Sequence, residues 1–397
     1  MTTSPYIVFI PGSIPPLDWR RRVLSEVTRE GCLAWLAGAG LSPEEIKALF
    51  ALDADPVQLH DSWMRSETFR RDAELPEKLC RALTKSGTQD LIDRYSRLIA
   101  QMSIQAITIL DPDYPPRLRL LPNAPSILFC QGSLTALDGP SVSVVGSRNA
   151  SLKGLEATRA IAEQLSRAGV RVISGLAYGI DAAAHQGCLR GPSPTIAVLG
   201  CGLDQNYPAE NAALRRQILE KSGLVLSEYA PGEKPLGWHF PFRNRIVTGL
   251  GDCLVVMEAQ IRSGSMTSVQ HALDQGREVF VYPGDPDSRK SEGNHQLLRD
   301  GANYFTTAQD LLEDMGWLDK AAPLMQNTSR AQETEASLSA GEKSLCQQLS
   351  RGEQSFDELC AALRCTAAEL NANLSMLQIR GYVRALPGKR YQLLGEE

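Results

Sequence analysis

The 397-residue sequence contains no long hydrophobic run and no paired cysteine or histidine motif. Its nine cysteines form no CxxC pair, and its five histidines show no HExxH or His/Cys spacing, so neither a disulfide framework nor a zinc site is expected. The apolar run at residues 6–10 is too short for a signal peptide, and nothing approaches the ~20 apolar residues of a membrane span. We therefore expect a cytoplasmic protein with no membrane partner and no cofactor.

An excess of positive charge is also missing. Lys and Arg number 41 against 46 for Asp and Glu, which gives a formal net charge of -5. The balance holds along the chain, with 15 basic and 16 acidic residues in 1–134, 17 and 20 in 135–316, and 9 and 10 in 317–397. Proteins that bind nucleic acid usually carry a basic footprint. Any site for a polyanion must therefore be a local cluster that folding creates.

Two common nucleotide-binding motifs are absent. The sequence has no GxxxxGK[ST] phosphate loop, and Gln205 stands where a dinucleotide fingerprint beginning at Gly200 would need its third glycine. Asp181 and His185 lie four residues apart on one face of a predicted helix, a spacing that more often ties a helix than forms a catalytic dyad. No catalytic residue is expected.

The middle of the chain alternates strands with helices. Its strands are nearly continuous apolar runs, a pattern typical of a parallel sheet that is covered on both faces. The predicted strands are 141–145, 170–173, 195–199, 224–227, 253–257 and 278–282, and the predicted helices are 155–168, 180–189, 210–221, 244–250, 267–275 and 296–299. With right-handed crossovers, this order predicts an α/β fold with a Rossmann-like, doubly wound and mostly parallel sheet.

Smaller regions flank this fold. Residues 17 to about 104 are predicted to be helical, with a helix start at Ser42-Pro43-Glu44-Glu45. Extended pieces at 107–110 and 127–130 lead into the sheet, and an Ala/Ser/Thr/Gln-rich stretch reads as a linker. The expected domains are a small helical (SAM-like) domain at 1–105, the Rossmann-like domain at 106–317, the linker at 318–340 and a winged helix at 341–397.

Three loops that follow strands carry the candidate site, because ligands of an open parallel sheet bind beyond the carboxyl ends of its strands. The loop Gly146-Ser147-Arg148 combines a tight turn, a hydroxyl and a guanidinium, and Arg262-Ser263-Gly264-Ser265 places the same types of group before a helix. Both combinations suit a phosphate oxygen. Each loop, taken alone, is equally consistent with an ordinary capped turn.

The loop at residues 235–245 is more informative because it interleaves aromatic rings with arginines. Its relevant residues are Trp238, His239, Phe240, Phe242, Arg243, Asn244 and Arg245. Bases stack on rings and phosphates attract guanidinium groups, so this pattern favours single-stranded nucleic acid. The alternative is that the rings cover the core while the arginines form ion pairs. Repeated Arg-containing loops fit a polynucleotide backbone better than a single mononucleotide.

Together these segments resemble the DNA processing protein A (DprA/Smf) family. The matching segments are 113–117, 145–148, 174–181, 200–211, 240–250, 255–259, 263–267 and 282–284, so the resemblance covers about residues 106–305. It implies a cytoplasmic homodimer that binds single-stranded DNA without catalysis, protects incoming strands during natural transformation and loads the RecA recombinase. The implied basic pocket is Ser147, Arg148, Arg243 and Arg262, with Phe240 as the ring that stacks on a base.

The full set of DNA-binding residues expected from loops and resemblance is Gly146, Ser147, Arg148, Lys234, His239, Phe240, Arg243, Asn244, Arg245, Arg262, Ser263, Gly264 and Ser265. Lys234 is included because some relatives place a lysine near position 237, where this chain has Gly237. In the winged helix, Arg380, Arg384, Lys389 and Arg390 would suit duplex or branched DNA, or simply form a solvated wing.

Two other functions stay open. Nucleotide phosphoribohydrolases resemble this fold, but they carry a PGGxGT motif followed by a catalytic Glu, and residues 263–272 here contain no carboxylate. The remaining alternative is an adaptor that binds protein through its flanking modules and does not bind DNA.

Overall fold

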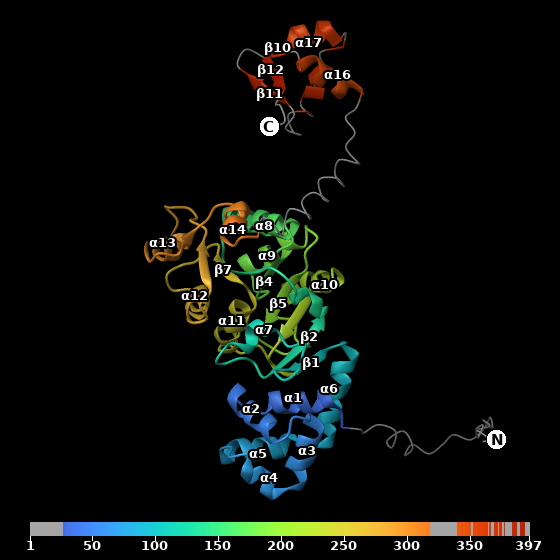
Figure 1. Ribbon diagram of the computed structural model, residues 1–397, viewed down its shortest axis with the longest axis vertical. Helices are drawn as coiled ribbons and strands as arrows, with labels where there is room; N and C mark the ends of the chain where they lie inside the picture. Colours follow the sequence, from blue (N-terminus) through green and yellow to red (C-terminus); the bar gives the residue numbers. More distant parts are fainter. Residues whose placement is uncertain are drawn as a thin grey trace, which may run out of the picture. The chain divides into compact units, whose positions relative to one another are not determined.

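A computed structural model of the chain describes residues 27–317 and 340–350 and, between 352 and 393, residues 352–363, 365–366, 369–371, 373–374, 377, 383–386 and 390–393. The chain forms two compact units, Met1–Leu324 and Met325–Glu397 (Figure 1). All of the predicted linker except Ala340 lies outside the described residues, as do Arg380 and Lys389. No helix in the described part of the chain is long and apolar enough to cross a membrane.

The first unit opens with a helical module. Its helices are α1 (Arg29–Gly38), α2 (Pro43–Leu52), α3 (Pro56–Arg65), α4 (Glu67–Asp72), α5 (Glu77–Ser86) and α6 (Gln89–Gln101). Helix α2 starts with the expected capping box, in which the Ser42 hydroxyl accepts from the Glu45 amide at 3.2 Å and the Glu45 carboxylate accepts from the Ser42 amide at 2.7 Å. The buried Trp35 indole donates to the Leu83 carbonyl at 3.0 Å, which ties α1 to α5.

A nine-stranded sheet follows, in the order β1-β2-β6-β5-β4-β3-β7-β8-β9. Its strands are β1 (Gln105–Thr108), β2 (Ile127–Gly132), β3 (Ser141–Val145), β4 (Arg171–Ser174), β5 (Thr195–Leu199), β6 (Leu224–Ser227), β7 (Cys253–Val256), β8 (Glu278–Val281) and β9 (Asn303–Tyr304). The strands from β6 to β9 in this order pair in parallel, whereas the pairs β1–β2 and β2–β6 are antiparallel. The predicted α/β fold with a mostly parallel sheet is confirmed.

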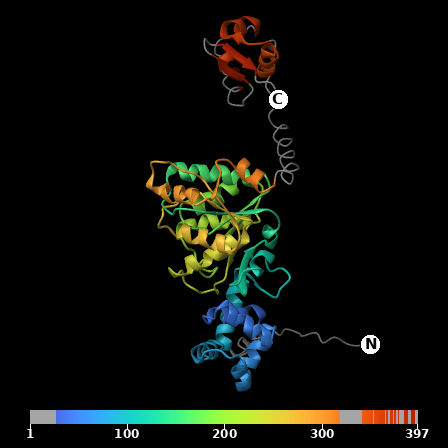
Figure 2. The ribbon, with the colours of Figure 1, turned by 60° about the vertical axis from the view of Figure 1, so that its left-hand side comes forward.

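Helices cover both faces of the sheet. They are α7 (Pro116–Arg119), α8 (Leu152–Arg167), α9 (Ile180–Cys188), α10 (Ala212–Glu220), α11 (His239–Leu250), α12 (Gly264–Asp274), α13 (Glu292–Arg299) and α14 (Ala308–Asp314). Val144 of β3 packs in one buried cluster with α8, α9 and α14, while Val145 packs in another with α11 and α12. Figure 2 shows green α8 and α9 on one side of the sheet and yellow α11 and α12 on the other.

One predicted boundary is wrong in a way that affects the site. Helix α11 begins at His239 and not at Asn244, so much of the predicted aromatic loop is helical. Pro241 is compatible with this start, because the amides of a first helical turn have no partner within the helix.

The helical module is tied to the first strands of the sheet. The Arg29 guanidinium lies 2.6 Å from the Asp111 carboxylate and donates to the Ala106 carbonyl of β1 at 2.8 Å. The Ser126 hydroxyl, just before β2, donates to the Pro43 carbonyl at 2.6 Å.

The second unit is a small winged helix with its own core. It contains α16 (Ala340–Leu349), β10 (Gln354–Ser355), α17 (Phe356–Leu363), β11 (Val383–Leu386) and β12 (Arg390–Leu393). The strands pair antiparallel in the order β10-β12-β11 around a buried cluster that includes Leu345, Leu359 and Leu374. Of the four basic residues expected here, Arg384 is exposed, and Arg390 pairs with Glu353 at 3.0 Å.

Candidate nucleic-acid interface

The loop after β3 holds Arg148 at the carboxyl edge of the sheet. Gly146 fits tightly beneath it, because a Cβ there would lie 2.5 Å from Ile180 Cγ1. The Ser147 amide donates to the Glu258 carbonyl at 2.7 Å, which joins this loop to the one after β7. The exposed Arg148 places its guanidinium carbon 5.3 Å from the centroid of the Phe240 ring. Arg148 thus presents a charge at the surface and rests on an aromatic ring.

Phe240 lies in the first turn of α11, with its ring over the loop after β5. A Cβ at Gly200 would lie 3.1 Å from Phe240 Cδ1, so the glycine allows this close approach. The Tyr207 ring contacts Phe240 with centroids 5.2 Å apart at 37°. Arg148, Tyr178, Tyr207 and Phe240 line one cleft at the ends of β3, β4 and β5. The structure therefore joins three sequence-distant loops in one aromatic and basic cleft.

Arg243 lies behind this cleft and not in it. It is only 3% exposed, and its guanidinium donates to the Gly175 carbonyl at 2.9 Å and to the Val198 carbonyl. Its Nε donates to the Asn244 side-chain oxygen at 3.3 Å. Burial raises the pKa of Asp181, and the Arg243 charge nearby opposes that rise. Arg243 therefore supports the cleft indirectly, because its hydrogen bonds fix the ends of β4 and β5.

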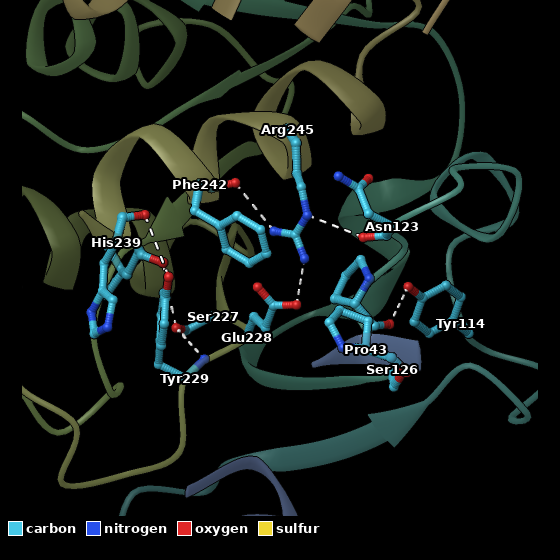
Figure 3. Close-up of polar contacts among 12 residues, drawn as sticks. Pro43, Tyr114, Asn123, Ser126, Ser227, Glu228, Tyr229, His239, Phe242 and Arg245 are labelled. Atoms are coloured by element: carbon cyan, nitrogen blue, oxygen red, sulfur yellow. Dashed lines mark hydrogen bonds and ion pairs between the residues drawn. The ribbon is translucent and has the colours of Figure 1, made fainter. Parts of the chain in front are cut away.

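Arg245 does not reach this edge at all. Its side chain is fully buried, donates to the Asn123 and Phe242 carbonyls at 3.1 and 3.2 Å, and pairs with Glu228 at 2.5 Å (Figure 3). Its guanidinium carbon also lies 3.9 Å from the centroid of the Phe242 ring. Arg245, one of the expected DNA-binding residues, therefore lies away from the cleft, because α11 turns it toward Asn123 and Glu228.

His239 is also a packing residue. It is buried, its Nδ1 lies 3.1 Å from the Gly200 carbonyl oxygen, and its ring stacks on Tyr229 with centroids 3.9 Å apart. Burial lowers the pKa of His239. By contrast, Lys234 and Trp238 are exposed in the loop just before α11. His239 fixes the start of the helix, while these two neighbours stay accessible.

The loop after β7 is a second candidate site for an anion. Arg262 is exposed and takes part in none of the ion pairs among the described residues. Ser263 is the N-cap of α12, yet its buried hydroxyl has no hydrogen-bond partner. The first turn of α12 contains Gly264 and the buried Ser265 and no acidic residue. An unpartnered hydroxyl, a helix amino end and a free guanidinium suit a phosphate group.

The amino end of α8 is already occupied by a carboxylate. Glu258, at the end of β7, accepts from the Ser151 amide at 2.9 Å and from the Ser151 hydroxyl at 2.5 Å. In doubly wound folds a nucleotide phosphate binds at the helix that follows the first parallel strand, which is α8 here. Sequence reasoning missed this internal anion because Ser151 and Glu258 are distant along the chain.

No catalytic or metal centre stands out in the described residues. His185 Nδ1 lies 2.7 Å from the Thr195 hydroxyl of β5, and Asp181 accepts from the Ala177 amide at 3.3 Å, so the two residues have different partners. Across the described ranges, no group of three or more His, Cys, Asp and Glu side chains could hold a metal ion.

Comparisons with known proteins show what the chain is similar to. Residues 105–316 match the family described as DNA recombination-mediator protein A, and residues 329–389 match the DprA winged helix domain. The chain is 44% identical over 209 residues to DNA processing protein DprA of Streptococcus pneumoniae, which covers 53% of this chain and 73% of that protein. It is 34% identical over 322 residues to Protein Smf of Synechocystis sp., which covers 74% of this chain and 81% of that protein. The crystal structure of DprA from Streptococcus pneumoniae superimposes with a TM-score of 0.60 at 35% identity, over 72% of this chain and 98% of the other.

Proposed function

Because the chain belongs to the DNA processing protein A (DprA/Smf) family, we propose that it is a recombination mediator that binds single-stranded DNA at the cleft formed by Arg148 and Phe240. The observation that carries this proposal is the guanidinium of Arg148 resting 5.3 Å from an aromatic ring at the open end of a parallel sheet. Phosphates pair with guanidinium groups and unpaired bases stack on rings, and this combination is typical of single-strand sites.

The proposed phosphate contacts are Arg148 and Arg262 at neighbouring loops, with the Ser263 hydroxyl and the open Gly264 beside them. Strand β3 lies next to β7, so the two exposed arginines follow adjacent strands. Lys234, which is exposed in the loop between β6 and α11, is a further candidate. In this proposal Arg243, Asn244 and His239 position the site, and Arg245 stabilises the fold away from it.

The cellular role that we propose is that of the family: protection of incoming strands during natural transformation and loading of the RecA recombinase. We further propose that the protein works in the cytoplasm as a homodimer and that its winged helix binds duplex DNA or protein. The exposed Arg384 supports duplex binding, although the pairing of Arg390 with Glu353 reduces the free charge of the wing.

We propose no enzymatic activity. A mononucleotide phosphate at α8 would have to displace the Glu258 carboxylate from Ser151 and would meet its negative charge. The first turn of α12 contains no acidic residue that could stabilise a sugar cation. Release of free base from nucleoside monophosphates, lost in the Arg148→Ala variant, would favour the phosphoribohydrolase alternative instead.

The test is a titration of oligo-dT at several salt concentrations. Arg148→Ala should weaken binding of all sequences similarly and reduce the salt slope by about one. Phe240→Ala should cost about 1–3 kcal/mol of binding free energy if the ring stacks on a base. Arg65→Ala is the matched control, because Arg65 is exposed on α3 of the helical module. Absence of oligo-dT binding at low salt would favour a protein-binding adaptor.

A further inference from the structure

Two tyrosines beside Phe240 have no role in the interface described so far. Tyr178 follows β4 and Tyr207 follows β5, and each is 41% exposed. Phe240 is less accessible, since Arg148 lies over its ring and Tyr207 packs against it. The larger free aromatic area of the cleft therefore belongs to the two tyrosines.

A hydrogen bond holds the Tyr178 ring in place, and the Tyr207 ring packs against Phe240. The Tyr178 hydroxyl donates to the Glu210 carboxylate, and both residues are exposed to solvent. One residue further on, the Asn211 side chain donates to the Leu176 and Ala177 carbonyls at 2.9 and 3.1 Å. Three contacts thus join the loop after β4 to the 3-10 helix η3 (Ala209–Asn211) that follows β5. A ring fixed before binding loses little conformational entropy when a base stacks on it.

Charge is distributed unevenly across the cleft. Arg148 and Arg262 follow β3 and β7, whereas Glu210 follows β5, so the sheet order β5-β4-β3-β7 places Glu210 apart from these two arginines. Phosphates are attracted to the basic end and repelled at the Glu210 end. A carboxylate can still accept hydrogen bonds from the exocyclic amino groups of unpaired bases.

We propose that Tyr178, Tyr207 and Glu210 form a base-binding subsite that accepts the unpaired bases of a single strand and rejects duplex DNA. The subsite rests on the proposed function, because it needs Arg148 and Arg262 to hold the backbone. A single strand directs its phosphates to the arginines and its bases to the tyrosines. A duplex brings the phosphates of its second strand toward Glu210, and its bases are already stacked and paired.

The test uses the full chain and three labelled ligands: oligo-dT, the same oligomer with abasic sites, and a duplex of equal length. Tyr178→Leu and Tyr207→Leu should each weaken oligo-dT binding by about 5- to 140-fold, the range for loss of one stacked base. They should weaken binding of the abasic oligomer far less, because that ligand has no base to stack. Tyr178→Phe keeps the ring and should retain most of the affinity.

Glu210→Gln tests the charge separately. It should strengthen duplex binding and leave oligo-dT affinity nearly unchanged. Glu220→Gln removes the same charge from the carboxyl end of α10 and should affect neither ligand. Circular dichroism spectra of the variants should match that of the wild type, which shows that each comparison is made between folded proteins.

The outcomes separate the two proposals. If the wild-type protein does not bind oligo-dT, the proposed function fails. If it binds, and Arg148→Ala weakens binding while both tyrosine-to-leucine variants bind oligo-dT like the wild type, the subsite is overturned. Equal effects of the tyrosine changes on the abasic and base-bearing oligomers would also overturn it, because the loss would not come from stacking.

Discussion

At the scale of single residues, the arginines near the cleft divide into free and committed charges. Arg148 and Arg262 are exposed. The guanidinium groups of Arg243 and Arg245 donate to backbone carbonyls, and that of Arg245 also pairs with Glu228. A buried arginine with several carbonyl acceptors has few donors left for a phosphate. Binding energy for DNA should therefore come from the exposed pair, and the buried pair should contribute to stability.

Replacing Arg245 tests this division. Arg245→Met leaves the Glu228 carboxylate, whose side chain is 15% exposed, without its cation. Removing one partner of a buried pair typically costs about 3–5 kcal/mol, so we expect a drop of this size in the free energy of unfolding measured in urea. Arg65→Met is the control, because its pair with Asp61 is exposed and should contribute at most about 1 kcal/mol. Lost oligo-dT affinity without lost stability would contradict the structural role of Arg245.

At the scale of elements, the early start of α11 decides which residues meet. In a helix with 3.6 residues per turn, Phe240 and Arg243 lie on one face, whereas Arg245 is rotated by about 200° from Arg243. Phe240 and Arg243 accordingly contact the ends of β4 and β5, while Arg245 contacts Asn123 and Glu228 on the other side. The sequence pattern that predicts an aromatic and basic loop therefore lies on a helix. One face of that helix carries Phe240 and Arg243, and another carries Arg245.

Helix α9 offers a test of how a buried titratable group contributes to stability. His185 is fully buried beside Thr195, and burial lowers its pKa to about 3, below its ordinary value of 6.5. Above about pH 6.5 the neutral imidazole fits the fold. As the pH falls from there toward about 3, the unfolded chain binds a proton that the folded chain refuses, so stability decreases by up to about 1.4 kcal/mol per pH unit.

The measurement compares wild type with His185→Gln by urea unfolding between about pH 8 and about pH 4. Other titrating groups are common to both proteins, so the difference in unfolding free energy isolates His185. We expect the advantage of the wild type to shrink as the pH falls. A difference that stays constant with pH would contradict a neutral, buried His185.

At the scale of the whole molecule, the net charge of -5 has to be compared with the positions of the exposed basic residues. Because 46 acidic residues outnumber 41 basic ones, the long-range field should not draw DNA to the whole protein. The free positive charge proposed for binding lies on Arg148, Arg262 and Lys234, in loops that follow three parallel strands. We also propose the division into residues 1–105, 106–317, 318–340 and 341–397, with the entire single-strand site in the second part.

Truncation tests this division. A chain that ends at Leu324 keeps the whole first compact unit and every residue of the proposed cleft. We expect it to bind oligo-dT with the affinity and salt slope of the full chain, and to lose whatever duplex affinity the winged helix provides. The measurement is a titration of both ligands with both proteins. A large loss of oligo-dT affinity in the truncated chain would show that the second unit shares the site.

The sequence by itself determined the strands and their parallel arrangement. Continuous apolar runs separated by glycine-rich loops admit little else, and six predicted strands overlap β3 through β8. It also pointed to Arg148, Phe240 and Arg262 as candidates, because the carboxyl ends of parallel strands meet at one edge, and their role in binding stays a prediction. Family membership followed from the order of these loops and is supported by the match over residues 105–316.

Only the tertiary structure decided which charges are available. Burial and hydrogen bonding arise between residues far apart in sequence: Arg245 with Glu228 and Asn123, Arg243 with Gly175 and Val198, Glu258 with Ser151. The same is true of Tyr178 and Tyr207, which become neighbours of Phe240 only when three loops converge. A sequence pattern lists the groups that a segment carries, but packing against distant segments determines which of them still face solvent.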